Sequence, residues 1–583
     1  MMNRTENLDR LSSEAFDLCI IGGGASGAGC ALDAALRGLK VALVEKTDFA
    51  AETSSRSTKL VHGGVRYLEQ AFKKFDFAQL RQVRHGLAER RIVLQNAPHL
   101  AHPLGLITPV FSWWEGLYIS IGLKLYDWFS NRRFQILDNQ AANRFPPSRW
   151  LNKREALEMM PGLSPNIHSA VLYYDGQMDD ARYCLALIQS AAEAGAVVAN
   201  HVEVTGFRKR DKGQLVAAIV KNQVENNQAI EIKARLFLNC TGPFADSIRL
   251  MANTDLIPRI RASKGVHLVL PQSVFNSDKA MLIPKTRDGR MVFVLPFEGS
   301  LLLGTTDEPY FDLEKEPVLE ADEVDFLLET LQPFVFKKIE KEQVKAGFGG
   351  IRPLIQPDPP PNAGMSMQNK PVPPSPIHQS PITNSPTHQT KSLLRDHEVE
   401  RDRISGLFSL LGGKWTTYRL MARDAVDAVC QELDVTNRCQ TEDQALAGAA
   451  GFEKDLWKKI RAEYGFDEDI CQHLASKYGG LAKVPAALAA ENPELAERIL
   501  PNFPFLKAEI VYAVREEMAL TIRDFLARRI RLEFLDWEAA KQAAPVIAKW
   551  MGKTLTWSET EQRARTEEYV ALLDSFLQSA KKV

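Results

Sequence analysis

Short apolar runs and a helix-like segment follow one another near the start of the chain. Residues 16–21 form an apolar run of strand length, residues 28–38 are rich in Ala and Leu and end on a glycine, and residues 39–44 are largely apolar again. This order predicts a strand, a helix and a second strand within about thirty residues, which is a βαβ unit.

Later segments of the chain show other patterns of apolar and polar residues. Between residues 262 and 304, apolar runs alternate with Gly, Asp and Pro, which predicts an antiparallel sheet. Residues 236–242 read as a late strand of the first domain, and the chain from residue 440 onward is mostly helical. We therefore expect a mixed α/β and α+β fold, with a Rossmann-like dinucleotide-binding domain, an antiparallel-sheet substrate lobe and a helical C-terminal domain.

Shifts in composition set the expected boundaries. Residues 1–15 are short and polar and predict a disordered tail. Residues 357–391 hold ten of the chain's 31 prolines, no aromatic residue and three formal charges, and predict a flexible insertion. A large first domain is expected over residues 16–430, with dinucleotide-binding parts at 16–95, 165–260 and 392–430 and a second lobe at 96–164 and 261–356, and a helical domain is expected at 440–583.

Two amphipathic segments are candidate contact surfaces. Residues 111–129 gather apolar side chains on one side, as in a helix that lies at a membrane interface or packs on the protein's own sheet. In residues 516–536, pairs of arginines flank a mixed apolar face. We expect these arginines to be solvated; contact with anionic lipid or with a second subunit is the alternative. The apolar side of the first segment comprises Trp114, Leu117, Tyr118, Ile121, Leu125, Trp128 and Phe129.

Composition narrows the class of protein. A chain of 583 residues predicts two or three domains, and a formal charge of −1 gives no support for nucleic-acid binding. The seven cysteines are scattered without a C-x-x-C or Cys/His cluster, so we expect neither a metal nor a disulfide framework, and a reducing cytoplasm fits. Residues 1–15 match no secretory or transit signal, and no apolar run reaches the ~18 residues that span a bilayer.

The βαβ unit carries a glycine motif of the G-x-G-x-x-G type. Gly22 suits the tight turn, Gly24 lets the backbone approach a pyrophosphate, and Gly27 lets helix and strand pack closely. Glu45, 23 positions after Gly22, suits a ribose hydroxyl pair and repels a 2′-phosphate. FAD or NAD is therefore expected, and NADP is not.

A hydroxyl-rich stretch at residues 53–69 follows the βαβ unit and contains a Gly-Gly turn between cationic side chains. Hydroxyls and turn N–H groups are what a phosphate or a flavin edge accepts. A solvated charged loop is the alternative, but the position directly after the dinucleotide motif favours an active-site loop. Its candidate residues are Ser54, Ser55, Lys59, His62, Arg66 and Tyr67.

Three segments together resemble a known family. Residues 21–38 (IGGGASGAGCALDAALRG), 54–69 (SSRSTKLVHGGVRYLE) and 412–422 (GGKWTTYRLMA) are similar to segments of the FAD-dependent glycerol-3-phosphate dehydrogenases, and weaker similarity covers nearly all of residues 16–430. The resemblance implies FAD as cofactor, sn-glycerol 3-phosphate as substrate and a membrane quinone as electron acceptor. It also implies peripheral association with the inner face of the cytoplasmic membrane, and it allows a homodimer.

Residue roles follow from the resemblance and from charge. Three glycine-flanked loops distant in sequence (HGGVR, FGGIR and LGGK) would converge on the substrate phosphate, with Arg66, Tyr67, Arg352 and Lys414 as its ligands. The base that takes the hydroxyl proton is expected to be His62, with His267 second and Arg352 or water as further alternatives. The expected cofactor-binding residues are Gly22, Gly24, Gly27, Glu45, Ser54, Ser55, Lys59, Gly242, Gly412, Gly413 and Thr416.

Three rival functions remain open at the level of sequence. A soluble glycerol-3-phosphate oxidase would use the same fold and substrate with oxygen as acceptor. An amino-acid oxidase would need one arginine for a carboxylate, which the Arg66, Arg352 and Lys414 set disfavours. A non-catalytic flavin-binding or scaffold protein is suggested only by the proline-rich insertion.

Overall fold

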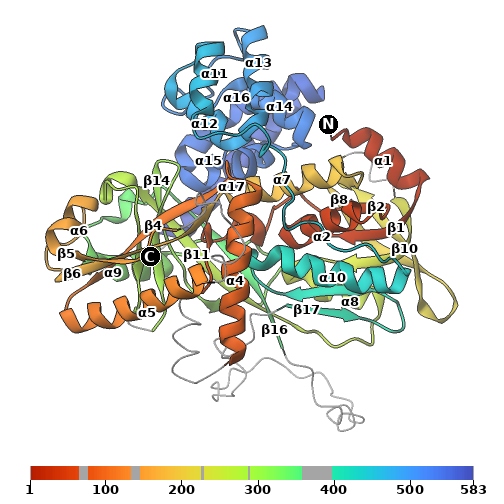
Figure 1. Ribbon diagram of the computed structural model, residues 1–583. Coiled ribbons are helices and arrows are strands. Elements are labelled where there is room, and N and C mark those ends of the chain that lie inside the picture. Colours follow the sequence, from red (N-terminus) through yellow and green to blue (C-terminus); the bar gives the residue numbers. More distant parts are fainter. Residues whose placement is uncertain are drawn as a thin grey trace, which may run out of the picture.

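Two β-sheets lie side by side beneath a cap of helices in the computed structural model (Figure 1). The structure describes residues 2–64, 77–132, 145–224, 229–286, 289–356 and 397–581. The insertion predicted at residues 357–391 lies outside these ranges.

The first sheet is the predicted dinucleotide-binding sheet. Its central strands run parallel in the order β18-β10-β1-β2-β7, and β17 and β9 add antiparallel neighbours. Helices α2 (Ala25–Leu36), α7 (Asp180–Glu193) and α10 (Tyr418–Leu433) pack into one core beside it. The strands are β1 (Ala15–Ile21), β2 (Val41–Val44), β7 (Val197–Ala199), β8 (Val202–Lys209), β9 (Leu215–Asn222), β10 (Ala229–Asn239), β17 (His397–Arg401) and β18 (Phe408–Gly412).

The second sheet is mostly antiparallel, which confirms the prediction for residues 262–304. The expected boundary at residue 165 is wrong, because β6 pairs with β4 in this sheet and an apolar strand carries no local mark of its partner. The strands are β3 (Leu60–Val61), β4 (Ala101–Val110), β5 (Arg149–Asn152), β6 (Ser169–Met178), β11 (Ile260–Pro271), β12 (Ala280–Ile283), β13 (Val292–Phe297), β14 (Ser300–Gly304), β15 (Glu308–Pro309) and β16 (Ala346–Ile355). The accompanying helices are α4 (Phe77–Asn96), α5 (Trp113–Arg132), α6 (Lys153–Met159) and α9 (Ala321–Leu331), whereas α8 (Ala245–Ala252) packs on the first sheet.

The C-terminal domain is helical, as predicted, and it is not an independent unit. Leu268 of β11 and Ile547 of α16 belong to the same buried apolar cluster, so the second sheet and the helical domain share a core. The helices are α11 (Leu456–Tyr464), α12 (Glu468–Tyr478), α13 (Lys483–Glu491), α14 (Lys507–Glu517), the π-helix η13 (Asp524–Arg529), α15 (Leu532–Leu535), α16 (Trp537–Leu555) and α17 (Glu559–Lys581).

The prediction of a disordered tail over residues 1–15 is wrong for the helix α1 (Arg4–Ser13). Leu11 is buried, and the Asn7 side-chain amide donates to the Val198 carbonyl of β7 at 2.8 Å. Arg4 donates to the Asn222 side chain at 2.8 Å. Contacts with distant strands therefore order a segment whose own composition is polar.

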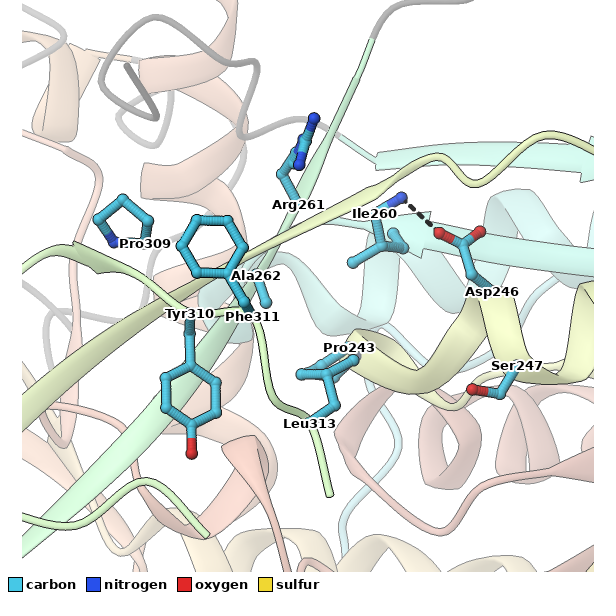
Figure 2. A pocket seen from close by; sticks show the side chains of 10 residues that line it. All are labelled: Pro243, Asp246, Ser247, Ile260, Arg261, Ala262, Pro309, Tyr310, Phe311 and Leu313. Atoms are coloured by element: carbon cyan, nitrogen blue, oxygen red, sulfur yellow. Dashed lines mark hydrogen bonds between the residues drawn. The ribbon is translucent and has the colours of Figure 1, made fainter. Parts of the chain in front are cut away.

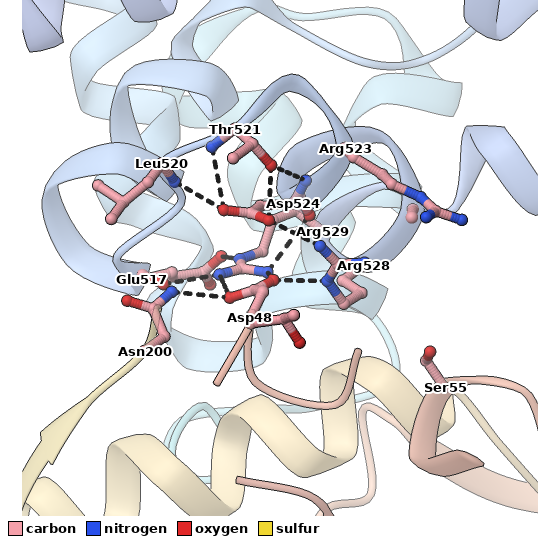
Figure 3. A network of polar contacts seen from close by, with 12 residues as sticks. Asp48, Ser55, Asn200, Glu517, Leu520, Thr521, Arg523, Asp524, Arg528 and Arg529 are labelled. Carbon is pink, nitrogen blue, oxygen red and sulfur yellow. Dashed lines mark hydrogen bonds and ion pairs between the residues drawn. The ribbon is translucent and has the colours of Figure 1, made fainter. Parts of the chain in front are cut away.

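The arginines of residues 516–536 were expected to be solvated, and for three of them this is wrong. Arg528, Arg529 and Arg531 are buried in the interface between the helical domain and the first sheet. Arg528 and Arg529 both bind the Asp48 carboxylate, each at 2.6 Å, within the network of Figure 3. A buried guanidinium needs carboxylate and carbonyl partners, which come from segments that local sequence does not reveal.

Helix α5 packs on the protein along one side, as in one of the two alternatives, and its contact with a membrane stays a prediction. Its inner side packs on the protein, with Leu123 and Tyr126 buried, while Trp114, Tyr118 and Ile121 are 65%, 55% and 55% exposed. The side chains of Trp128 and Phe129 lie outside the described part of the structure. Among the described helices, none combines the length and apolar character that crossing a bilayer requires.

Candidate functional site

The glycine turn between β1 and α2 forms a cradle that side chains would fill. Gly22 has φ +107°, and a Cβ there would lie 2.8 Å from the Cys240 carbonyl oxygen. A Cβ on Gly27 would lie 1.9 Å from the Gly22 carbonyl oxygen, and one on Gly24 would meet the Ser54 hydroxyl. The small turn thus leaves room for a pyrophosphate at the N-terminal end of α2, so these residues fit a bound dinucleotide.

Glu45 follows β2 at the same edge of the first sheet. Its carboxylate accepts hydrogen bonds from the Gly23 N–H at 2.7 Å and from the Thr47 N–H at 2.9 Å. Partial burial raises the pKa of Glu45, and these two N–H groups oppose that shift. The carboxylate is held beside the glycine turn, where the predicted ribose contact requires it to be.

The loop of residues 53–59 links three parts of the site. The Ser54 hydroxyl accepts from the Ala25 N–H at the start of α2 at 2.9 Å, and the Ser54 carbonyl accepts from the Trp415 indole at 2.9 Å. The Thr53 hydroxyl donates to the Ile351 carbonyl of β16 at 2.7 Å. The glycine turn, the segment after β18 and the strand that carries Arg352 therefore meet at this loop.

Lys59 is the last residue of this loop. Its ammonium is buried and donates to the Ser55 carbonyl and to the Asp180 carboxylate, both at 2.7 Å. Burial lowers the pKa of Lys59 to about 7, with the Asp180 charge acting in the opposite direction. The structure gives Lys59 a role in shaping the loop, and Asp180, which the sequence analysis missed, is its partner. Nothing in the sequence around Asp180 signals this contact.

Arg352 and His267 lie near each other on neighbouring strands, β16 and β11. The Arg352 guanidinium donates to the Thr305 hydroxyl at 3.1 Å and to the Thr306 carbonyl at 3.0 Å, so it is held with one face toward the β14 turn. His267 Nε2 lies 3.0 Å from the Thr58 hydroxyl. Burial, together with the charges of Lys59 and Arg352, holds the pKa of His267 well below its ordinary value.

The second glycine turn follows β18. Gly412 and Gly413 have φ +68° and +89°, Lys414 is half-buried, and Thr416 is buried in the short 3₁₀ helix η11 (Trp415–Thr417). The Trp415 bond to the 53–59 loop brings this turn beside the first one. Gly242, with φ +55°, follows β10, whose neighbour β1 leads into the glycine cradle.

The third glycine loop is described only in part. His62 is half-buried after β3, and the Gly63 N–H donates to the Tyr126 hydroxyl of α5 at 2.8 Å. Arg66 and Tyr67 lie outside the described residues. The FGGIR segment lies within strand β16, so the prediction of a loop there is wrong, because these residues pair with β11. The convergence of Arg66, Arg352 and Lys414 on one phosphate stays a prediction.

A buried cluster of Asp48, His201 and Asp524 has ligand atoms within 4.8 Å of one another in the described chain. The two carboxylates already bind Arg528 and Arg529, and His201 binds Asp524 at 2.9 Å. The charges of the cluster are therefore compensated by protein groups, and we treat it as a structural network (Figure 3).

A separate pocket lies between α8, β11 and the segment after β15 (Figure 2). The Asp246 carboxylate at its edge accepts from the Ile260 N–H at 2.8 Å. None of the residues predicted for the site lines this pocket. Its lining residues are Pro243, Asp246, Ser247, Ile260, Arg261, Ala262, Pro309, Tyr310, Phe311 and Leu313.

Two family models match this chain. Residues 17–372 match the FAD dependent oxidoreductase family, and residues 439–562 match the C-terminal domain of alpha-glycerophosphate oxidase.

Full-length relatives agree with these matches. The chain is 40% identical to the probable mitochondrial glycerol-3-phosphate dehydrogenase of Caenorhabditis elegans, over 98% of this chain and 75% of that protein. It is 36% identical to the human mitochondrial glycerol-3-phosphate dehydrogenase, over 95% and 73%. The structure of the glycerol-3-phosphate dehydrogenase from Bacillus halodurans in complex with FAD superposes with a TM-score of 0.75, at 30% identity, over 99% of this chain and 98% of that one.

Proposed function

The chain belongs to the family of FAD-dependent glycerol-3-phosphate dehydrogenases, and we propose that it oxidises sn-glycerol 3-phosphate to dihydroxyacetone phosphate and passes the electrons to a membrane quinone. One observation carries the proposal beyond family membership. The glycine cradle, the strand with Arg352 and the turn with Lys414 meet at the 53–59 loop. Acceptance of a hydride from C2 is the chemistry that bound FAD supplies at this site.

The charges of the site support a phosphorylated substrate. Glycerol 3-phosphate carries close to two negative charges at neutral pH, and a cleft that holds it needs several cations. Arg352 offers a planar fork for phosphate oxygens, and Lys414 offers a point charge. An amino-acid substrate needs a single arginine for its carboxylate, so two cations on adjoining segments favour the phosphate.

The proton of the C2 hydroxyl is taken by His62 in this proposal. A general base works best with a pKa near the working pH. The pKa of His267 is held well below its ordinary value, so its ring is neutral and a weak base, and it suits a hydrogen-bonding role beside Thr58. His62 is half-buried in the loop that leads toward Arg66.

The variant His62→Asn is expected to keep FAD. Its flavin should be reduced by glycerol 3-phosphate at least ~10²-fold more slowly, because a general base contributes about this factor. Anaerobic stopped-flow absorbance at saturating substrate measures this rate. His168→Asn, at an exposed position beside Ser169, serves as the matched control and should reduce at the wild-type rate. An unchanged rate in His62→Asn would remove this histidine from the mechanism.

Substrate and acceptor are tested in one sequence of measurements. Glycerol 3-phosphate added without oxygen should bleach the flavin absorbance, and glycerol alone should not, because the cations select for phosphate. The reduced enzyme is then mixed with a soluble quinone or with air-saturated buffer. Faster reoxidation by quinone supports the dehydrogenase, and faster reoxidation by oxygen identifies the oxidase.

The outer face of α5 supports association with the inner surface of the cytoplasmic membrane, where quinone is found. Trp113, Trp114 and Tyr118 are 49%, 65% and 55% exposed, and the ring of neighbouring Phe111 packs on Phe334 at 5.4 Å. Exposed Trp and Tyr on a helix face are typical of interfacial helices. A second copy of this chain is the alternative occupant of the face.

The double variant Trp114→Ser, Ile121→Ser is expected to reduce co-sedimentation with phospholipid vesicles by at least fivefold, because it removes about 2 kcal/mol or more of apolar burial. Ile257→Ser, 58% exposed near α8, is the matched control and should bind as wild type. If the double variant binds vesicles as the wild type does but sediments as a monomer where the wild type is a dimer, the face is instead the interface of a homodimer.

A further inference from the structure

Arg531 reaches from the helical C-terminal domain to the underside of the candidate site. Its side chain is 0% exposed, and its guanidinium donates to the Ser55 carbonyl at 2.6 Å and to the Asp180 carboxylate at 3.1 Å. Its backbone has φ +65° and follows the π-helix η13. A left-handed non-glycine residue and a π-helix are both unfavourable local conformations that are concentrated at functional sites.

Two of the acceptors of Arg531, the Ser55 carbonyl and the Asp180 carboxylate, are also used by Lys59. The Lys59 ammonium donates to the Ser55 carbonyl and to the other oxygen of Asp180, and that oxygen also accepts from the Ser57 N–H at 3.0 Å and the Ser57 hydroxyl at 2.7 Å. The loop of residues 55–59 is therefore fixed from below by one carboxylate and two cations. One of the cations belongs to the C-terminal domain.

A column of rings makes a second connection from Arg531 to the site. The guanidinium lies over the Phe534 ring, 4.7 Å from its centre. Phe534 stacks on Phe348 with 4.8 Å between centres, and Phe348 stacks on the ring of His267 at 5.0 Å. His267 in turn contacts the hydroxyl of Thr58, which belongs to the anchored loop. Both connections therefore end in the loop of residues 55–59.

We propose that Arg531 is a positioning residue of the dehydrogenase, through which the C-terminal domain holds the 55–59 loop and the ring of His267 in their reactive arrangement. The inference rests on the proposed function and assigns a catalytic purpose to the C-terminal domain. Arg182 offers a contrast in the same interface. It pairs with Glu517 at 2.7 Å and stacks on Tyr478, and neither contact involves the 55–59 loop.

The test compares Arg531→Met, Arg531→Lys and the matched control Arg182→Met, all as full-length enzyme saturated with FAD. We expect Arg531→Met to reduce its flavin at least about tenfold more slowly at saturating glycerol 3-phosphate, because displacement of reacting groups by an ångström or less has effects of this order. Arg531→Lys should recover part of the rate. Arg182→Met should melt at a lower temperature and still reduce at the wild-type rate.

A second readout needs no substrate. The visible circular dichroism of bound FAD should change in Arg531→Met and stay as wild type in Arg182→Met, because only the first change releases a loop of the cofactor site. Equal dichroism and equal reduction rates in the two variants would overturn the inference and leave Arg531 as a structural residue. Failure of the wild type itself to be bleached would instead reject the proposed function, and the dichroism would still decide the role of Arg531.

If Arg531→Met does not fold, the variant Phe534→Leu tests the positioning role in its place. It removes the ring between the guanidinium and Phe348 and keeps an apolar side chain in the core. Slower flavin reduction with altered dichroism supports the positioning role, and wild-type values for both reject it.

Discussion

Replacement of Arg352 by Gln is expected to lower kcat/KM for glycerol 3-phosphate by about 10²- to 10³-fold, the effect of removing one partner of a buried charge pair. The guanidinium is held on one side by neutral acceptors, the Thr305 hydroxyl and the carbonyls of Thr306 and Lys264. The Asp307 carboxylate lies 3.5 Å away as a longer ion-pair partner. Gln would keep some hydrogen bonding but would leave the phosphate dianion short of one charge.

Steady-state assays with an artificial electron acceptor measure this change, and bound FAD per chain shows whether the cofactor site survives. Arg352→Lys should fall between the wild type and Arg352→Gln, because an ammonium keeps the charge and loses the planar fork. Arg261→Gln, an exposed cation on the adjoining strand β11, is the matched control and should retain wild-type kcat/KM. A loss smaller than about threefold in Arg352→Gln would exclude a direct contact with the phosphate, since such contacts are worth far more.

Replacement of Arg529 by Met is expected to destabilise the folded protein by about 3–5 kcal/mol, the usual cost of breaking a buried ion pair from one side. Arg529 is 0% exposed and binds both oxygens of Asp48, at 2.6 and 3.0 Å, and the Glu517 carbonyl at 2.7 Å. Figure 3 shows it at the centre of the network between the first sheet and the helical domain. Its removal leaves the Asp48 charge with Arg528 and Asn200 alone.

Thermal melts of the FAD-saturated enzyme measure this effect as a lowered Tm. The Tm is used because multidomain chains often unfold irreversibly, and a free energy of unfolding is then not defined. The exposed pair of Arg154 and Glu158 gives the control, because Arg154→Gln should change stability by less than about 0.5 kcal/mol. The double variant Asp48→Asn, Arg529→Met should lose less than the sum of the two single changes, because position 48 then carries no buried negative charge. Additive losses would mean that the two groups are not energetically coupled.

The elements of the fold that depend on local pattern were predictable. The strand, glycine turn and helix of residues 16–44, the antiparallel runs of 262–304 and the helical C-terminal part each carry a period or a turn signal of their own. The glycines of the first cradle were found for the same reason, since the turn itself requires them. Arg352 and His267 were named from a resemblance, and their proximity follows from the pairing of β16 with β11.

Other features depended on contacts that a linear pattern does not contain. Strand β6 belongs to the second sheet because β4 pairs with it, and α1 is ordered by β7 and by Asn222. The expected direct contact of Lys59 with the cofactor stays a prediction, and its ammonium points to Asp180 and the Ser55 carbonyl.

The sequence by itself determined the dinucleotide-binding turn and the order of strands and helices, because glycine turns and apolar periods act over a few residues. Its resemblance to a known family gave the family and FAD as the cofactor. Only the tertiary structure decided that three arginines of the C-terminal domain are buried against Asp48 and Ser55 rather than solvated. The physical reason is that a charged side chain is stable in either place, and the partners Asp48 and Ser55 lie more than four hundred residues away in the sequence.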